Sequence, residues 1–226
     1  MSKASIERVL GLLLKEYGSR NWQSTGSPLA ILIRTILSQN TSDTNSERAF
    51  QSLLAVFPSW EDVAAAESDE IAASIRSGGL ENIKAQRIKQ ALNEIQRQRG
   101  RLELNFLNEL SLAEGRDWLK RLPGVGTKTA NCVFLFSLGR PALPVDTHVF
   151  RVAKRLGLVD AKTSVEQTHR LLESLVPPGN VYQFHVSMIE HGRKVCKAQR
   201  PRCPQCVLQR LCPNYGIHAA KYPRKP

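Results

Sequence analysis

Near its middle the chain reads Leu122-Pro123-Gly124-Val125-Gly126-Thr127-Lys128-Thr129-Ala130. This stretch predicts a tight turn between two helices, because Pro123-Gly124 ends the first helix and Gly126 is free to take a positive φ. The first helix is expected to begin at the capping box Ser111-Leu112-Ala113-Glu114, and the second to run over residues 127–138. The N–H groups of the turn and of the second helix's start then point outward together, which makes a site for an anion such as a nucleic-acid phosphate.

Lys128 stands in the first turn of that second helix. The positive end of the helix dipole disfavours an ammonium ion there and favours the neutral amine. A neutral lysine is a nucleophile that can form a Schiff base with a sugar aldehyde. From the local sequence alone, the alternative is a surface lysine that lies near a bound phosphate.

The charge of the chain is strongly basic and unevenly distributed. The 226 residues carry a formal net charge of +12, and no Asp or Glu follows Glu190. The basic residues after this point are Arg193, Lys194, Lys197, Arg200, Arg202, Arg210, Lys221, Arg224 and Lys225. A one-sided basic end is typical of proteins that bind DNA or RNA, although a solvated basic tail also explains the segment from Lys221 to Pro226.

Composition predicts a globular protein of the cytoplasm or nucleoid. Hydrophobic residues make up 42% of the chain and charged residues 23%, which is ordinary for a globular protein. No apolar run approaches the ~20 residues that a membrane span needs. The short run Val9–Leu14 follows Glu7 and has no cleavage-like site, so it is interpreted as a helix face and not as a signal peptide. We expect a monomer without membrane contact.

Hydrophobic periodicity predicts helices almost throughout and no strands, so the expected fold class is all-α. The segment 28–37, preceded by Ser27, is apolar on nearly every side and should be a buried central helix. Asp43 is expected to cap the helix after it, and a capping box at 163–166 to begin a late helix. Other helices are expected at residues 5–17, 60–66, 69–75, 81–99, 147–156 and 181–194.

Four cysteines follow the spacing Cys196-x6-Cys203-x2-Cys206-x5-Cys212. Four thiolates on one short loop can ligate a 4Fe–4S cluster or converge on Zn²⁺. Structural zinc usually uses two C-x2-C pairs, and this segment has only one, so the spacing favours the cluster over zinc and over unligated thiols. The fifth cysteine, Cys132, is expected to be a core thiol. Because no secretory segment is found, we expect no disulfides.

Together these motifs resemble the endonuclease III family, which are helix-hairpin-helix DNA glycosylases with an iron–sulfur cluster. The resemblance rests on Leu122–Ala130, on Val145-Asp146-Thr147-His148 and on the cysteine spacing, and it extends from Ser27 to Cys212. It implies a two-lobed helical protein that binds duplex DNA containing a damaged base or an abasic site. It also strengthens the prediction of a 4Fe–4S cluster.

The resemblance implies a division of the chain into two domains. A six-helix barrel is expected over residues 27–139, with the helix-hairpin-helix at about 111–139. The other domain joins residues 1–26 to residues 140–226 and contains the cluster loop, 196–212. By the same analogy, the protein flips a damaged base out of the duplex and pays for its unstacking.

The resemblance also assigns chemistry to single residues. Lys128 matches the family's Schiff-base lysine, which displaces the base at C1′ and then allows β-elimination of the 3′ phosphate. Asp146 matches the acidic residue that deprotonates this lysine or stabilises the developing oxocarbenium charge, and it is also well placed to cap the helix 147–156. Leu80 matches an apolar wedge that enters the base stack, although alone it reads as a loop leucine folded onto the core.

Two departures from the familiar enzymes leave the substrate open. Those enzymes carry Ala-Gln-Ala-Thr-Asp where this chain has Gln39-Asn40-Thr41-Ser42-Asp43, and they often carry tyrosine where it has Glu81. Gln39 and Asn40 lie where an amide fills the gap left by the flipped base, and the alternative is that they cap the end of the helix before them. Oxidised pyrimidines are the preferred substrate, and mismatched thymine or uracil, or modified cytosine, is the alternative.

Three classes of function therefore compete. A bifunctional DNA glycosylase and AP lyase of base-excision repair is preferred over a non-catalytic DNA-binding module, because binding alone needs neither Lys128 nor Asp146. An electron carrier is the third class. Lys197, Arg200 and Arg202 lie on the stiffened cysteine loop, where they can follow a phosphate backbone. The full set of residues expected to contact DNA is Gly124, Val125, Gly126, Thr127, His148, Lys197, Arg200 and Arg202.

Overall fold

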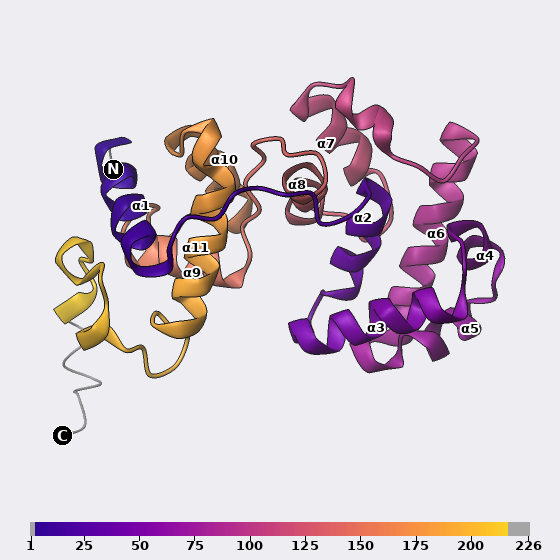
Figure 1. Ribbon diagram of the computed structural model, residues 1–226, viewed down its shortest axis with the longest axis horizontal. Coiled ribbons are helices and arrows are strands. Elements are labelled where there is room, and N and C mark those ends of the chain that lie inside the picture. The colour runs from indigo at the N-terminus through magenta and orange to yellow at the C-terminus, as the bar shows by residue number, and fades with distance from the viewer. Residues whose placement is uncertain (1–2, 217–226) are drawn as a thin grey trace. The chain divides into compact units, whose positions relative to one another are not determined.

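The computed structural model describes residues 3–216 of the chain (Figure 1). Within these residues the secondary structure is helical, without strands, which confirms the all-α prediction. None of the helices in the described part is long and apolar enough to cross a membrane. The last basic residues, Lys221, Arg224 and Lys225, lie outside the described range.

The chain divides into two compact units. One unit consists of Gln23–Arg140, and the other joins Met1–Trp22 to Pro141–Pro226. The sequence placed these boundaries at 26/27 and 139/140. Each unit is described below by itself.

The unit Gln23–Arg140 is built around a helix that is apolar on nearly every side. This helix, α2 (Pro28–Leu37), begins at Ser27, whose hydroxyl accepts a hydrogen bond from the N–H of Ala30. Its buried residues include Leu29, Ile31, Leu32, Ile33, Ile36 and Leu37, which confirms the prediction of a buried central helix. The helices around it are α3 (Asp43–Val56), α4 (Trp60–Ala65), α5 (Ser68–Ser74), η1 (Arg76–Gly78), α6 (Glu81–Arg99), η2 (Asn105–Asn108), α7 (Leu112–Lys120) and α8 (Thr127–Phe136).

The second unit packs helices from both ends of the chain. It contains α1 (Lys3–Tyr17), α9 (Thr147–Arg155), α10 (Val165–Leu175), η3 (Pro178–Asn180), α11 (Val181–Lys194), η4 (Cys203–Gln205) and η5 (Gln209–Leu211). Helix α11 packs against α1 and α9 and supplies the buried Phe184 and Met188. Two buried histidines hold the segment before α9: Nδ1 of His169 lies 2.9 Å from the carbonyl of Leu143, and Nδ1 of His185 lies 2.9 Å from that of Pro144.

Three predicted details of the helix ends are wrong by one or two residues. The cap of α3 is Ser42, and Asp43 is the first helical residue. The late capping box pairs Ser164 with Gln167, whereas the sequence suggested residues 163–166. The glycine with a positive φ is Gly124, at 76°, while Gly126 is extended with φ −99°.

Gly124 and Gly126 therefore make different demands on the backbone, and single alanine substitutions should separate them. We expect Gly124→Ala to lower the free energy of unfolding by about 1–2 kcal/mol, the cost of a side chain in the left-handed region. Its methyl group would also lie 2.6 Å from Cδ of Arg87. Gly126→Ala meets no atom within 4 Å and should unfold at nearly the wild-type urea concentration. Equal losses in the two variants would contradict the assignment of the turn.

Candidate nucleic-acid interface and cysteine pocket

The turn between α7 and α8 leaves the start of α8 without a side-chain cap. The predicted capping box of α7 is confirmed, with Ser111 and Glu114 bonded reciprocally. The N–H of Val125 bonds the carbonyl of Leu122 at 3.2 Å and closes the turn. The N-cap of α8 is Gly126, which has no side chain to occupy the N–H groups of the first helical turn. The arrangement is suited to binding an anion at this point.

Lys128 occupies the second position of α8 and is partly exposed. The helix that carries it is fixed from within the unit. The Arg116 Nε donates to Asn131 Oδ1 at 2.7 Å, joining α7 to α8, and the ring of Phe134 packs where Gly115 has no side chain. Cys132 is buried in this helix, as the sequence predicted. Lys128 is thus a partly exposed amine on a rigid helix.

The predicted gap-filling residue Gln39 is bonded at both ends of its amide. Its Nε2 donates to the carbonyl of Gly124 at 3.0 Å, and its Oε1 accepts from Nη1 of Arg87 at 2.9 Å. The structure thus joins the segment after α2 to the hairpin turn. Arg87, on α6, was not identified from the sequence.

Asn40 is presented differently from Gln39. It is exposed and has φ 53°, in the left-handed region that asparagine tolerates better than most residues. The main-chain cap of α2 is Ser38, whose N–H bonds the carbonyls of Arg34 and Ile36. Of the two amides considered from the sequence, that of Asn40 is the one presented to solvent.

The side chain of Leu80 is not folded onto the core, so the alternative that it is an ordinary buried loop leucine is excluded. Its side chain is 47% exposed, and its φ of 54° places a branched apolar residue in the left-handed region. This backbone conformation costs roughly 1–2 kcal/mol and persists only where the surroundings impose it. Leu80 is the N-cap of α6, directly after Gly79, which also has a positive φ of 67°.

Asp146 caps α9, as predicted. Its Oδ1 accepts a hydrogen bond from the N–H of Val149 at 2.7 Å. Asp146 belongs to the second compact unit and Lys128 to the first. Its proposed part in the chemistry stays a prediction.

His148 packs within the second unit. Nη2 of Arg151 lies 3.1 Å from its Nδ1, and its Cβ lies against Gly192 of α11. Burial lowers the pKa of His148, so the ring is neutral at pH 7. A hydrogen bond from the ring to the Gly192 main chain opposes this shift, so both Arg151 and α11 hold the orientation of the ring. Contact with DNA stays a prediction.

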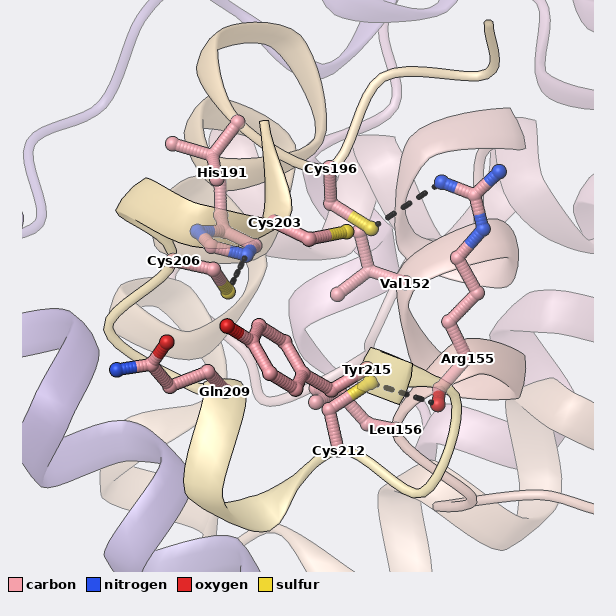
Figure 2. Close-up of a pocket in the computed structure, with 11 residues that line it drawn as sticks. Val152, Arg155, Leu156, His191, Cys196, Cys203, Cys206, Gln209, Cys212 and Tyr215 are labelled. Carbon is pink, nitrogen blue, oxygen red and sulfur yellow. Dashed lines mark hydrogen bonds between the residues drawn. The ribbon is translucent and has the colours of Figure 1, made fainter. Parts of the chain in front are cut away.

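Cys196, Cys203, Cys206 and Cys212 line a single pocket at the end of α11. Figure 2 shows their side chains around this pocket, with Val152 of α9 and Leu156, the C-cap of that helix, on its apolar wall. Burial raises the pKa of the Cys203 and Cys212 thiols and raises that of Cys206 to about 12. A metal centre that binds these thiols must therefore displace their protons.

Arg155 holds both ends of the cysteine segment. Its Nη1 donates to Sγ of Cys196 at 3.4 Å and to the carbonyl of Lys197 at 2.7 Å (Figure 2). Its own carbonyl accepts from Sγ of Cys212 at 3.2 Å and from Asn214 Nδ2 at 2.8 Å. Arg151, one turn earlier, donates to the carbonyl of Cys196 at 2.9 Å. These two roles were not predictable from the sequence, where Arg151 and Arg155 are only two arginines at helical spacing.

A buried histidine connects the pocket to α1. The hydroxyl of Tyr17 lies 2.9 Å from Nδ1 of His191, whose Nε2 lies 3.5 Å from Sγ of Cys206. Burial lowers the pKa of His191 to about 4, so the ring is neutral. Burial also raises the pKa of Tyr17, so its hydroxyl keeps its proton. The two ring nitrogens of His191 thus link Tyr17 of α1 to the thiol of Cys206.

Hydrogen bonds hold the main chain of the loop that carries the three predicted basic residues, and their side chains lie at the surface. The carbonyl of Lys197 accepts from Arg155, and the N–H of Arg202 donates to the carbonyl of Val195 at 2.9 Å. Arg200 and Arg202 are exposed, and Lys197 is partly exposed. The arrangement suits contact with a polyanion, and the contact stays a prediction.

The chain matches, over residues 33–178, the family described as HhH-GPD superfamily base excision DNA repair protein. It is 44% identical over 165 residues to a putative DNA glycosylase of Arabidopsis thaliana, covering 73% of this chain and 56% of that protein, so it spans little more than half of that relative. It is 36% identical to endonuclease III of Thermotoga maritima, covering 93% of each chain. A trapped covalent intermediate of endonuclease III with DNA superposes with a TM-score of 0.82 at 32% identity, covering 96% of this chain and 98% of that one.

The capping function of Asp146 can be separated from any chemical role by substitution. We expect Asp146→Ala to lower the free energy of unfolding by about 1 kcal/mol, because the N–H of Val149 loses its acceptor. Asp146→Asn should stay within a few tenths of a kcal/mol of wild type, because an asparagine oxygen caps a helix equally well. Urea unfolding of both variants measures this, and a destabilised Asn variant would show that the carboxylate charge, and not the cap, stabilises α9.

Proposed function

The chain belongs to the HhH-GPD superfamily of base excision DNA repair proteins, and we propose that it is a bifunctional DNA glycosylase and AP lyase. The single observation that supports this activity best is Lys128, a partly exposed amine in the first turn of a helix whose N-terminus has no side-chain cap. An anion-binding helix start beside a nucleophile suits a reaction on the sugar of a nucleotide whose phosphate is bound there.

In the proposed reaction, Nζ of Lys128 attacks C1′ of the damaged nucleotide. The bond from C1′ to the base breaks, a C1′–N bond forms, and the base leaves with a proton. The C1′–O4′ bond then breaks and O4′ takes up a proton, which opens the sugar ring and leaves a C1′=N iminium. This iminium acidifies the C2′ proton, whose removal expels the 3′ phosphate by cleavage of the C3′–O bond. Hydrolysis of the imine then returns the lysine. Asp146 would accept the lysine's proton or stabilise the positive charge that develops on the sugar.

The turn 124–127 would position the DNA for this reaction. Main-chain N–H groups at the start of α8 donate to a phosphate without any sequence preference, as expected of an enzyme that inspects all sequences. Lys197, Arg200 and Arg202 would add contacts to the DNA backbone. His148 would add one more contact to the DNA.

Leu80 and Asn40 would support the flipped state of the damaged nucleotide. An exposed leucine held in a left-handed backbone conformation is suited to enter the base stack as a wedge. Asn40 is our choice for the gap-filling amide, because the amide of Gln39 is already bonded to Arg87 and to the Gly124 carbonyl. For the substrate we retain oxidised pyrimidines, with mismatched thymine or uracil, or modified cytosine, as the alternative.

We further propose that the four cysteines of the pocket hold a 4Fe–4S cluster. A single zinc ion would need four ligands at about 2.3 Å, whereas a cluster keeps its four thiolates farther apart. The four thiols line one pocket, and their x6, x2, x5 spacing contains a single C-x2-C pair, whereas structural zinc usually uses two. When bound, the cluster would cross-link the loop 196–212, with Arg155 and His191 beside its sulfur ligands.

The proposed activity predicts a covalent adduct that depends on Lys128. Borohydride should trap the protein on duplexes that carry an oxidised pyrimidine such as thymine glycol, and on an abasic site. Lys128→Ala should lower strand cleavage by more than about a thousandfold, since the nucleophile is removed, with duplex binding nearly unchanged. Uracil and thymine opposite guanine belong in the same panel, because an adduct with them alone would select the alternative substrates. Tight duplex binding without any adduct would favour the non-catalytic module.

The assignment of Asn40 predicts unequal effects at neighbouring positions. Asn40→Ala should slow single-turnover excision from a lesion duplex by about tenfold, which corresponds to the loss of roughly one hydrogen bond to the unpaired base. Gln39→Ala should lower the free energy of unfolding by about 1 kcal/mol, because two hydrogen bonds are removed, and should slow excision less. The reverse pattern would identify Gln39 as the gap-filling residue.

The cluster proposal predicts about four irons per chain and the broad visible absorbance of a 4Fe–4S centre in protein purified without oxygen. Cys206→Ser should lose both, because it removes one of four ligands. Cys132→Ser, outside the pocket, should keep both and serves as the matched control. A colourless protein with one zinc per chain would contradict the cluster.

A further inference from the structure

Lys84 is a lysine buried in the interior of the Gln23–Arg140 unit. Its side chain lies in the first turns of α6, and the residue is 1% exposed. Its Nζ donates to the carbonyl of Leu37 at 2.8 Å and to the carbonyl of Gly78 at 2.9 Å. Burial also lowers its pKa. Lysines are rarely buried, because removing an ammonium ion from water is costly unless protein atoms bond it, so this position calls for an explanation.

The two carbonyls belong to the two segments that are proposed to enter the DNA. Leu37 is the last residue of α2, three positions before Asn40, and Gly78 ends η1, two positions before Leu80. The N–H of Lys84 also bonds the carbonyl of Leu80 at 2.9 Å. Lys84 therefore bonds the main chain before the proposed gap-filling residue, Asn40, and on both sides of the proposed wedge, Leu80.

The contacts around Lys84 leave little room for adjustment. A Cβ on Gly78 would lie 3.1 Å from Cβ of Ala49 and 3.9 Å from Nζ of Lys84, so the main chain passes close between α3 and the ammonium group. Asn40 and Leu80 both have a positive φ, which a residue other than glycine keeps only when its surroundings fix it. A common cation that bonds both segments provides such a constraint.

We propose that Lys84 is a positioning residue that fixes the 37–40 and 78–80 segments relative to each other, so that Asn40 and Leu80 enter the duplex together. The inference rests on the proposed glycosylase function. Without the ammonium group, the two carbonyls lose their shared donor and each segment moves independently. The flipped state of the nucleotide is then no longer supported, whereas the chemistry at Lys128 is unaffected.

The test compares Lys84→Met with Lys89→Met, which removes a lysine of the same helix whose Nζ pairs at 3.5 Å with Glu67. Base flipping is followed by the fluorescence of 2-aminopurine placed beside a thymine glycol. Excision is measured in single turnover on the same duplex, and borohydride trapping on a single-stranded abasic oligonucleotide, which needs no flipping. Thermal unfolding reports whether each variant is folded.

We expect Lys84→Met to lose the fluorescence change and to slow duplex excision by about a hundredfold, as misplaced positioning groups do, while single-strand trapping stays at the wild-type rate. Lys89→Met should match wild type in all three assays. Excision by Lys84→Met at the rate of Lys89→Met would overturn the inference, and so would equal losses in excision and single-strand trapping, which would indicate general damage to the protein.

If Lys84→Met does not fold, Lys84→Gln replaces it, because a glutamine amide keeps a donor for one of the two carbonyls. This variant should show reduced duplex excision with normal single-strand trapping, and wild-type excision by Lys84→Gln would overturn the inference. A wild-type protein that is trapped on neither DNA would overturn the proposed function, and the inference with it. If only the inference about Lys84 is wrong, the wild-type protein is still active, so this failure can be distinguished from failure of the proposed function.

Discussion

Helix ends leave main-chain N–H and C=O groups without partners inside the helix, and the way each end is satisfied decides what it can do in this protein. Helix α9 has its N-terminus closed by the Asp146 carboxylate. The N-cap of helix α8 is Gly126, which has no side chain, so the N-terminus of the helix is suited to an outside anion. At the C-terminal end of α2, the carbonyl of Leu37 accepts a hydrogen bond from Nζ of Lys84. The candidate interface is therefore defined as much by how these helix ends are capped as by the side chains around them.

Local signals in the sequence predicted the elements well and their exact ends less well. The bounds of α6 and the capping box at Ser111 were correct, because helix limits and capping boxes depend on residues close in the chain. The cap of α3 was misplaced by one residue, because Ser42 and Asp43 are both good caps and packing chooses between them. The two glycines of the turn could not be distinguished locally, since the close approach to Gly124 comes from Arg87 on another helix.

Long-range contacts explain what the sequence could not predict. The cysteine pocket was predictable because its four thiols follow one another at a recognisable spacing, whereas the arginine that holds them, Arg155, comes 41 residues before Cys196. Lys84 reaches a carbonyl 47 residues away and Arg87 an amide 48 residues away. On a helix rich in charged residues, neither is distinguishable by periodicity from its exposed neighbours. Their roles follow from the fold, which brings three separate segments against one face of α6.

Backbone strain gives independent support to three sites chosen from the sequence. Among the described residues, those other than glycine that have a positive φ are Asn40, Leu80 and Arg200. The sequence indicates all three as residues that meet DNA. Such a conformation costs roughly 1–2 kcal/mol for Leu80 and Arg200 and less for Asn40, so it persists where the surrounding structure imposes it. Lys84 bonds the segments of Asn40 and Leu80, and Arg155 bonds the loop that leads to Arg200. In each case a buried or partly buried cation, bonded to main-chain carbonyls, restrains a segment that carries a strained residue at the proposed interface.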